Sequence, residues 1–87
     1  MNIPQLDATG RRVLQVIRDR GVVTGRELAA EAGLTPEVLL PIVQKLISSD
    51  LVSASGNIYD TNQVGDAYFN IRPSNLPLAE FVLRSSA

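Results

Sequence analysis

The 87-residue sequence contains no cysteine and no histidine. The absence of cysteine excludes disulfides and thiolate nucleophiles, and the absence of both residues removes the usual ligands of zinc and haem. No histidine is available as a general base, and the carboxylates are scattered, with no pair in a recognisable catalytic motif. We therefore expect no enzyme activity, no metal ion and no cofactor.

Long apolar segments are also missing. The longest apolar run, residues 38–43, is only six residues long, whereas a membrane-spanning helix needs about 20. The first twenty residues carry several charges and no apolar stretch suited to a signal peptide. We expect a cytoplasmic protein with no membrane partner.

Neither charge sign dominates, because eight Lys and Arg stand against nine Asp and Glu, for a formal net charge of −1. The chain thus lacks the positive field that draws many proteins to nucleic acid. Its length predicts a single small domain over residues 1–87, with a modest core.

Three segments have the periodicity of amphipathic helices, and each starts at a capping residue. The expected caps are Asp7, Thr24 in a capping box with Glu27, and Thr35 followed by Pro36. Gly21 and Gly33 end the first two segments. We predict helices over 7–20, 25–32 and 36–49, with the last two forming a helix-turn-helix unit.

After Asp50 the periodicity becomes that of strands, which we predict over 51–55 and 67–72. Residues 56–66 either form a long tip between these strands, which we favour, or begin with a tight turn at Gly56-Asn57. The pair Val22-Val23 is either a short link or one strand of a small sheet. A closing helix over 76–84 carries an apolar stripe of Leu78, Phe81 and Val82.

This order of elements is that of the winged helix-turn-helix, an α+β fold that is mainly helical. Residues 6–52, just over half of the chain, resemble the DNA-binding half of the leucine-responsive (Lrp-type, feast/famine) regulators. The residues that carry the resemblance are Leu6-Asp7, Arg12-Val13-Leu14, Glu27-Leu28-Ala29, Gly33-Leu34-Thr35-Pro36, Val43, Leu46 and Leu51-Val52. The resemblance implies a three-helix core, a two-stranded hairpin wing and a short C-terminal helix. It also implies that the third helix enters the major groove of double-stranded DNA.

The third helix is expected to bury Leu39, Val43 and Leu46 and to direct its opposite side outward. That outward arc comprises Glu37, Leu40, Pro41, Gln44, Lys45 and Ser48. Gln44, Lys45 and Ser48 have the chemistry that reads DNA grooves, and the candidates for phosphate contacts are Arg26, Arg11 and Arg12. On this interpretation the protein is a small transcriptional regulator or an accessory factor, acting as a homodimer.

Other residues favour a protein-interaction or dimerisation module that does not bind DNA. The segment 56–66 contains Asp60 and Asp66 but no Lys or Arg, which does not suit a wing that follows phosphates. The candidate interface consists of Glu37, Leu40 and Pro41 together with Leu78, Phe81 and Val82. We interpret the arginines of the first helix as a solvated face paired with nearby acids. We place DNA binding first because it is the usual role of the fold, while these residues favour the alternative.

Pro41 lies past the first turn of the third helix, so it removes the backbone hydrogen bond to Glu37. We expect a kink at this point or a first turn that is distorted toward a 3₁₀ helix.

Overall fold

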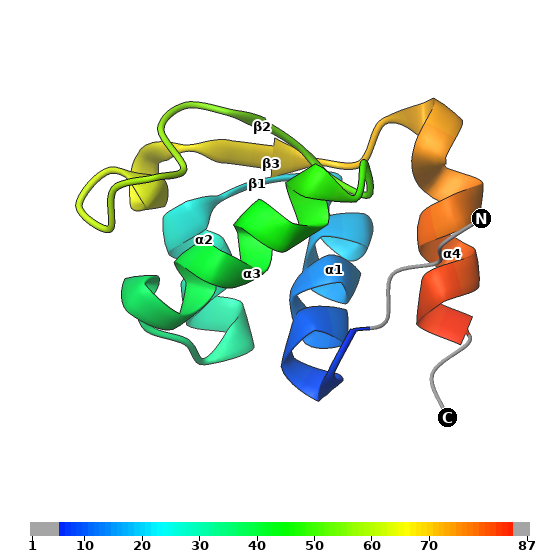
Figure 1. Ribbon diagram of the computed structural model, residues 1–87, viewed down its shortest axis with the longest axis horizontal. Coiled ribbons are helices and arrows are strands. Elements are labelled where there is room, and N and C mark those ends of the chain that lie inside the picture. The colour runs from blue at the N-terminus through cyan, green and yellow to red at the C-terminus, as the bar shows by residue number, and fades with distance from the viewer. Residues whose placement is uncertain (1–5, 85–87) are drawn as a thin grey trace.

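The computed structural model describes residues 6–84, and three helices form the centre of the fold. They are α1 (Ala8–Arg20), α2 (Gly25–Ala32) and α3 (Pro36–Ser48). A small sheet runs along one side of these helices, and α4 (Leu76–Arg84) packs beside α1 at the far end from α2 (Figure 1). This is an α+β fold, mainly helical, with the architecture of a winged helix-turn-helix.

The predicted capping residues start the three helices. The side chain of Asp7 accepts a hydrogen bond from the backbone of Gly10 at 2.7 Å, and Thr35 accepts one from Val38 at 3.4 Å. In the capping box, Thr24 accepts from the backbone of Glu27, while the Glu27 carboxylate accepts from the backbone and the hydroxyl of Thr24. These hydrogen bonds, the backbone one first, lower the pKa of Glu27 because they favour its charged form.

The sheet has three antiparallel strands, in the order β1-β3-β2. They are β1 (Val22–Thr24), β2 (Ser53–Ser55) and β3 (Tyr68–Asn70). Ser55 pairs with Tyr68, so the long connection between β2 and β3 is confirmed and the tight turn is excluded. The Val22-Val23 pair belongs to a strand, because β1 pairs with β3 along its whole length.

The two wing strands are shorter than predicted. Leu51 and Val52 are buried, and their backbone N–H groups donate to the carbonyl of Leu46 at 3.0 and 3.4 Å. They therefore complete the end of α3 instead of starting β2, as the prediction of 51–55 had it. The prediction of 67–72 is also too long, since Ala67 bonds back into the 3₁₀ helix η1 (Val64–Asp66) and a second one, η2 (Pro73–Asn75), follows Arg72.

The core lies between the three central helices and the inner face of the sheet. Its fully buried members include Leu14, Leu28, Leu39 and Phe69. From α4 the buried residues are Ala79 and Val82, whereas Phe81 is 50% exposed. Of the predicted stripe, Val82 is buried and Leu78 packs partly buried against the core, whereas Phe81 is half exposed because the side of α4 that contacts α1 is turned toward Ala79.

The α3 helix continues through Pro41 without interruption (Figure 1). In its first turn the carbonyl of Thr35 accepts from both Val38 at 3.1 Å and Leu39 at 2.9 Å. The α-type bond from Leu39 is the shorter of the two, and shared bonds of this kind are common at helix ends, so this turn is not evidence of a distortion caused by Pro41.

Candidate nucleic-acid interface

The outer side of α3 carries few groups that suit DNA. The predicted inner side is confirmed, since Leu39, Val43 and Leu46 are fully buried. The exposed residues of the helix are Pro36, Glu37, Val38, Pro41, Lys45 and Ser48. Lys45, in the second half of the helix, is the one cation among them. The exposed residues of the first half are apolar or acidic.

Gln44 and Leu40 are not fully outward, which corrects the predicted arc. The Nε2 atom of Gln44 donates to the backbone carbonyl of Ile58 at 2.9 Å, and Leu40 is half-buried against the core. The contact with Ile58 places the side chain of Gln44 against the connection between β2 and β3. Val38, which the predicted outward arc did not include, is 47% exposed.

Ser48 uses its hydroxyl proton within its own helix, because Oγ donates to the carbonyl of Gln44 at 2.8 Å. A contact from Ser48 to DNA would therefore be made through the lone pairs of its oxygen or after this bond is released.

The residues between β2 and β3, which we call the wing loop (residues 56–67), pack against α2 and α3. Val64 is 1% exposed and Ile58 is 8% exposed, so the loop contributes to the core. The backbone N–H of Gly25 donates to the carbonyl of Ala67 at 2.9 Å. A Cβ atom on Gly25 would lie 2.0 Å from the carbonyl oxygen of Val64, which shows how closely the loop approaches α2.

Arg26, one of the predicted phosphate contacts, lies beside the start of α3. It lines an open hollow of about 400 Å³, together with Pro36 and Leu39 of α3 and part of the wing loop. Its Nη2 atom forms an ion pair with Oδ1 of Asp66 at 3.0 Å, and both side chains are about three-quarters exposed. The guanidinium is thus accessible, and it already has an anionic partner.

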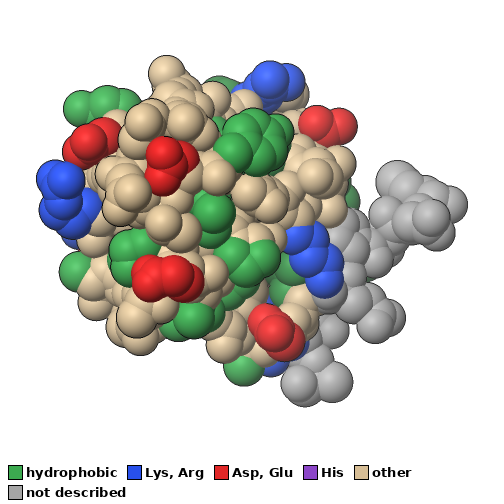
Figure 2. Space-filling view, turned by 60° about the vertical axis from the view of Figure 1, so that its left-hand side comes forward, with side chains coloured by type: hydrophobic (Ala, Val, Ile, Leu, Met, Phe, Trp, Pro, Cys, Tyr) green, Lys and Arg blue, Asp and Glu red, His purple; other side chains and the backbone are tan. Residues whose placement is uncertain are grey.

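Charge on this side of the molecule is mixed. Figure 2 looks toward the wing loop, α2 and the start of α3, and it shows separate Asp and Glu side chains among hydrophobic ones. Lys and Arg form no continuous area in this view. A surface of this kind gives weaker long-range attraction to DNA than a basic stripe does.

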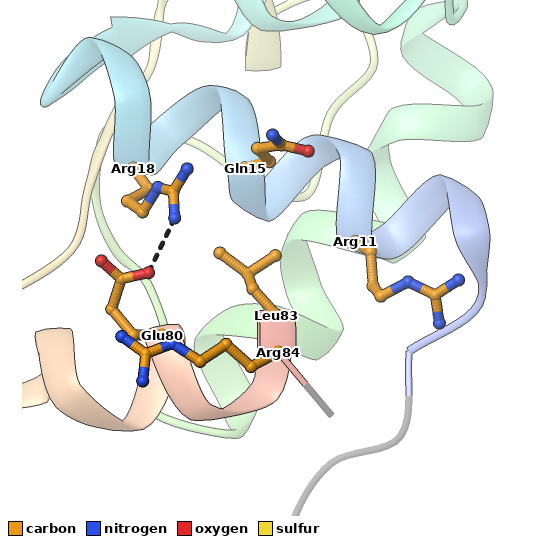
Figure 3. A pocket seen from close by; sticks show the side chains of 6 residues that line it. All are labelled: Arg11, Gln15, Arg18, Glu80, Leu83 and Arg84. Carbon is orange, nitrogen blue, oxygen red and sulfur yellow. Dashed lines mark hydrogen bonds and ion pairs between the residues drawn. The ribbon is translucent and has the colours of Figure 1, made fainter. Parts of the chain in front are cut away.

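Arg11 lies on a different part of the molecule from Arg26. It lines a groove of about 380 Å³ between α1 and α4, with Gln15, Arg18, Glu80, Leu83 and Arg84 (Figure 3). Its Nη1 atom donates to the carbonyl of Leu6 at 3.1 Å. The fold therefore does not bring the predicted phosphate contacts into one surface around α3.

The other arginines of α1 pair with acidic residues or with a carbonyl, as the interpretation of a solvated face predicts. Arg18 contacts Asp19 at 2.9 Å and Glu80 at 2.7 Å, and the hydrogen bond to Glu80 contributes most to a raised pKa of this guanidinium. Two glutamates of α2, Glu27 and Glu31, lie 3.0 and 2.9 Å from Arg20. Arg12 donates to the backbone carbonyl of Glu31 at 3.4 Å.

Within residues 6–84, no cluster of acidic side chains has an arrangement that could hold a metal ion. In the same part of the chain, no helix combines the length and the apolar character needed to cross a membrane.

Solved structures of transcription regulators share this fold. BpsR of Bordetella bronchiseptica, whose DNA binding is regulated by 6-hydroxynicotinic acid, matches 97% of this chain with a TM-score of 0.72 at 17% sequence identity. The adhesin competence repressor AdcR of Streptococcus pyogenes matches 91% with a TM-score of 0.65 at 16% identity. ZitR of Lactococcus lactis, a zinc-responsive MarR family member, matches 91% with a TM-score of 0.66 at 18% identity.

These matches establish a winged helix-turn-helix fold. They do not support the resemblance to Lrp-type regulators, since none of them is described as one and ZitR is a MarR family member. The chain spans 61%, 56% and 52% of the length of the three structures, in the order given above. No protein-family profile matches the sequence, and no curated protein matches it.

Two features of this surface escaped sequence reasoning. Val38, 47% exposed, was not included in the predicted outward arc of α3. The pairing of Arg26 with Asp66 joins residues 40 positions apart. The two aspartates of the segment 56–66 indicated that an acidic side chain was present there, but not that Asp66 would pair with Arg26.

Proposed function

We propose that this chain is a winged-helix DNA-binding protein, either a small transcriptional regulator or an accessory factor, that acts in the cytoplasm as a homodimer. The observation that carries the proposal is α3, a capped helix held to the core by one side and exposed along the other. It stands in a fold shared with BpsR, a protein whose DNA binding is regulated. Helices in this position commonly enter the major groove.

Lys45 is the residue on which binding depends most in this proposal, because it is the one cation on the exposed side of α3. Gln44 reads a base edge after it leaves the carbonyl of Ile58, and Ser48 offers its oxygen. Arg26 contacts a phosphate beside α2. Arg11 and Arg12 of α1 are proposed as contacts to more distant phosphates.

Affinity for DNA of random sequence is expected to be modest. Counterion release by Lys and Arg supplies most of the nonspecific affinity of DNA-binding proteins. Here the net charge is −1, and Arg18, Arg20 and Arg26 are already paired with acids.

The test is titration of a fluorescent random-sequence duplex by anisotropy, at low salt and at physiological salt. We expect binding that weakens steeply with salt. Lys45→Ala should weaken binding to all duplexes similarly and flatten the slope of log K against log salt by about one unit. Arg20→Ala is the matched control, because it also removes one positive charge, from a side chain that pairs with Glu27 and Glu31 and has no proposed contact with DNA, and it should leave the slope nearly unchanged. Equal slopes for the wild type and Lys45→Ala would contradict this placement of DNA.

A second candidate is a protein-interaction module that keeps the fold without binding DNA. The observation that favours it is the first half of the exposed side of α3, where Val38 and Pro41 are apolar and Glu37 is acidic. The same titration separates the two functions, since a folded protein that binds no duplex even at low salt supports the second. Leu40, half-buried, contributes less to such an interface than Val38 does.

A further inference from the structure

Two of the side chains proposed to contact DNA are held by the wing loop in the free protein. Arg26 forms its ion pair with Asp66 at 3.0 Å, and Gln44 donates to the carbonyl of Ile58 at 2.9 Å. Asp66 and Ile58 both belong to the wing loop. They lie 40 and 14 positions further along the chain than Arg26 and Gln44.

The loop that carries Asp66 is firmly placed. Val64, two residues before Asp66, is 1% exposed, and its backbone N–H donates to the carbonyl of Asp60 at 2.9 Å. Ala67, the next residue after Asp66, accepts a hydrogen bond from the backbone of Gly25 at 2.9 Å. These contacts on both sides keep the carboxylate beside the first turn of α2, where Arg26 lies.

The chemistry of the pair resembles the contact expected with DNA. A carboxylate oxygen on a guanidinium N–H forms the same kind of charge-assisted hydrogen bond as a phosphate oxygen does. The side chains of Arg26 and Asp66 are 76% and 73% exposed, so a phosphate can replace the carboxylate without opening the core. An ion pair this exposed adds little to folding stability, and its main effect is on the charge that Arg26 presents.

We propose that Asp66 acts as an internal competitor of the DNA phosphate at Arg26 and so lowers affinity for duplexes of any sequence. The proposal rests on the DNA-binding function proposed above. When a phosphate binds Arg26, the carboxylate of Asp66 loses its ion pair and lies beside the negative charge of that phosphate. The carboxylate then attracts a cation from solution. That uptake offsets the cation released from the phosphate, so Arg26 contributes little net affinity in the wild type.

The test compares Asp66→Asn with Asp60→Asn in the duplex titration described above. Both variants remove one negative charge from the wing loop, and Asp60 accepts its hydrogen bond from the backbone of Asn62, which an asparagine can also accept. We expect Asp66→Asn to bind a random duplex about fivefold more tightly at low salt. Its salt slope should be steeper by about 0.9, the value for one additional phosphate contact. Asp60→Asn should show a smaller gain and an unchanged slope.

Arg26→Ala completes the comparison. Introduced alone it should change affinity little, whereas in the Asp66→Asn background it should remove the whole gain. Thermal melting of every variant checks that the fold is retained.

The outcomes separate this inference from the function on which it rests. If the wild type binds and the two asparagine variants behave alike, the competitor role of Asp66 is wrong and DNA binding stands. If Asp66→Asn binds more tightly but Arg26→Ala does not remove the gain, the effect does not act through Arg26 and the inference is overturned. If neither the wild type nor Asp66→Asn binds at low salt, the proposed function fails and the inference fails with it.

Discussion

Gly25 shows how a single residue controls the position of the wing. It is the first residue of α2, it is buried, and its N–H donates to Ala67 of the wing loop. The carbonyl oxygen of Val64 occupies the space where any other residue would place its Cβ atom. The absence of a side chain at this position therefore lets the loop pack against α2, and that packing sets Asp66 beside Arg26.

Gly25→Ala should lower the free energy of unfolding by at least about 2 kcal/mol, because the backbone of Val64 has to move. Urea denaturation followed by circular dichroism measures the change. Gly65→Ala is the matched control, since a Cβ atom there would lie 3.7 Å from its nearest neighbour, at ordinary contact distance. Its stability should stay within about 1 kcal/mol of the wild type. Equal stability of the two variants would show that the wing loop does not rest on α2 in solution.

At the scale of the elements, α3 has a well-capped N-terminus and a proline in its interior. Thr35 and Pro36 provide a cap and a favourable first position. Pro41 then removes a backbone N–H in the middle of the helix, although its own side chain is exposed and fills no space in the core. The helix is maintained by burial of Leu39, Val43 and Leu46, which is a tertiary contribution.

Pro41→Ala should raise the free energy of unfolding by about 1–3 kcal/mol, because it restores the hydrogen bond to the carbonyl of Glu37 and loses little packing. Urea denaturation measures this directly. Pro36→Ala serves as the control, since no intrahelical partner exists for an N–H at the first position, and its effect should be within about 0.5 kcal/mol. A Pro41→Ala variant no more stable than the wild type would mean that the helix already accommodates the proline without loss.

At the scale of the whole molecule, the exposed apolar side chains of residues 6–84 include Val38 on α3 and Phe81 on α4, and each is a candidate centre for an interface between two copies. Both side chains are about half exposed, at 47% and 50%. Val82, the neighbour of Phe81, is buried within its own chain and is not available to a second copy. A homodimer built on α4 would leave α3 open to DNA, whereas an interface on α3 would cover it.

If the homodimer forms through α4, Phe81→Asp should convert it to a monomer in sedimentation equilibrium, with little change in melting temperature. Val38→Asp should leave the dimer intact. A dimer that is lost with Val38→Asp but kept with Phe81→Asp would support the protein-interaction module. Val82→Ala separates folding from association. It should lower the free energy of unfolding by about 1–3 kcal/mol without changing the mass of the dimer in sedimentation equilibrium. A wild type that is monomeric at high concentration would contradict the proposed dimer.

Much of the framework follows from the sequence through local chemistry. The capping residues Asp7, Thr24 and Thr35 satisfy free N–H groups a few residues away, so their positions predict where the helices begin. The buried side of α3 follows from apolar periodicity in the same way. Strand ends were predicted less well, because Leu51 and Val52 bond back to α3 instead of pairing with a neighbouring strand.

The tertiary structure decided how the candidate DNA-contact residues are used. Only the folded molecule shows that Gln44 contacts Ile58, that Val38 is exposed and that Arg26 pairs with Asp66. The packing of α4 against α1 likewise turned Phe81 outward and brought Glu80 to Arg18, 62 positions away. Capping and periodicity act over a few residues and can be read along the chain. The partners of a surface side chain depend on which distant segments the core brings together, and that information exists only in the folded molecule.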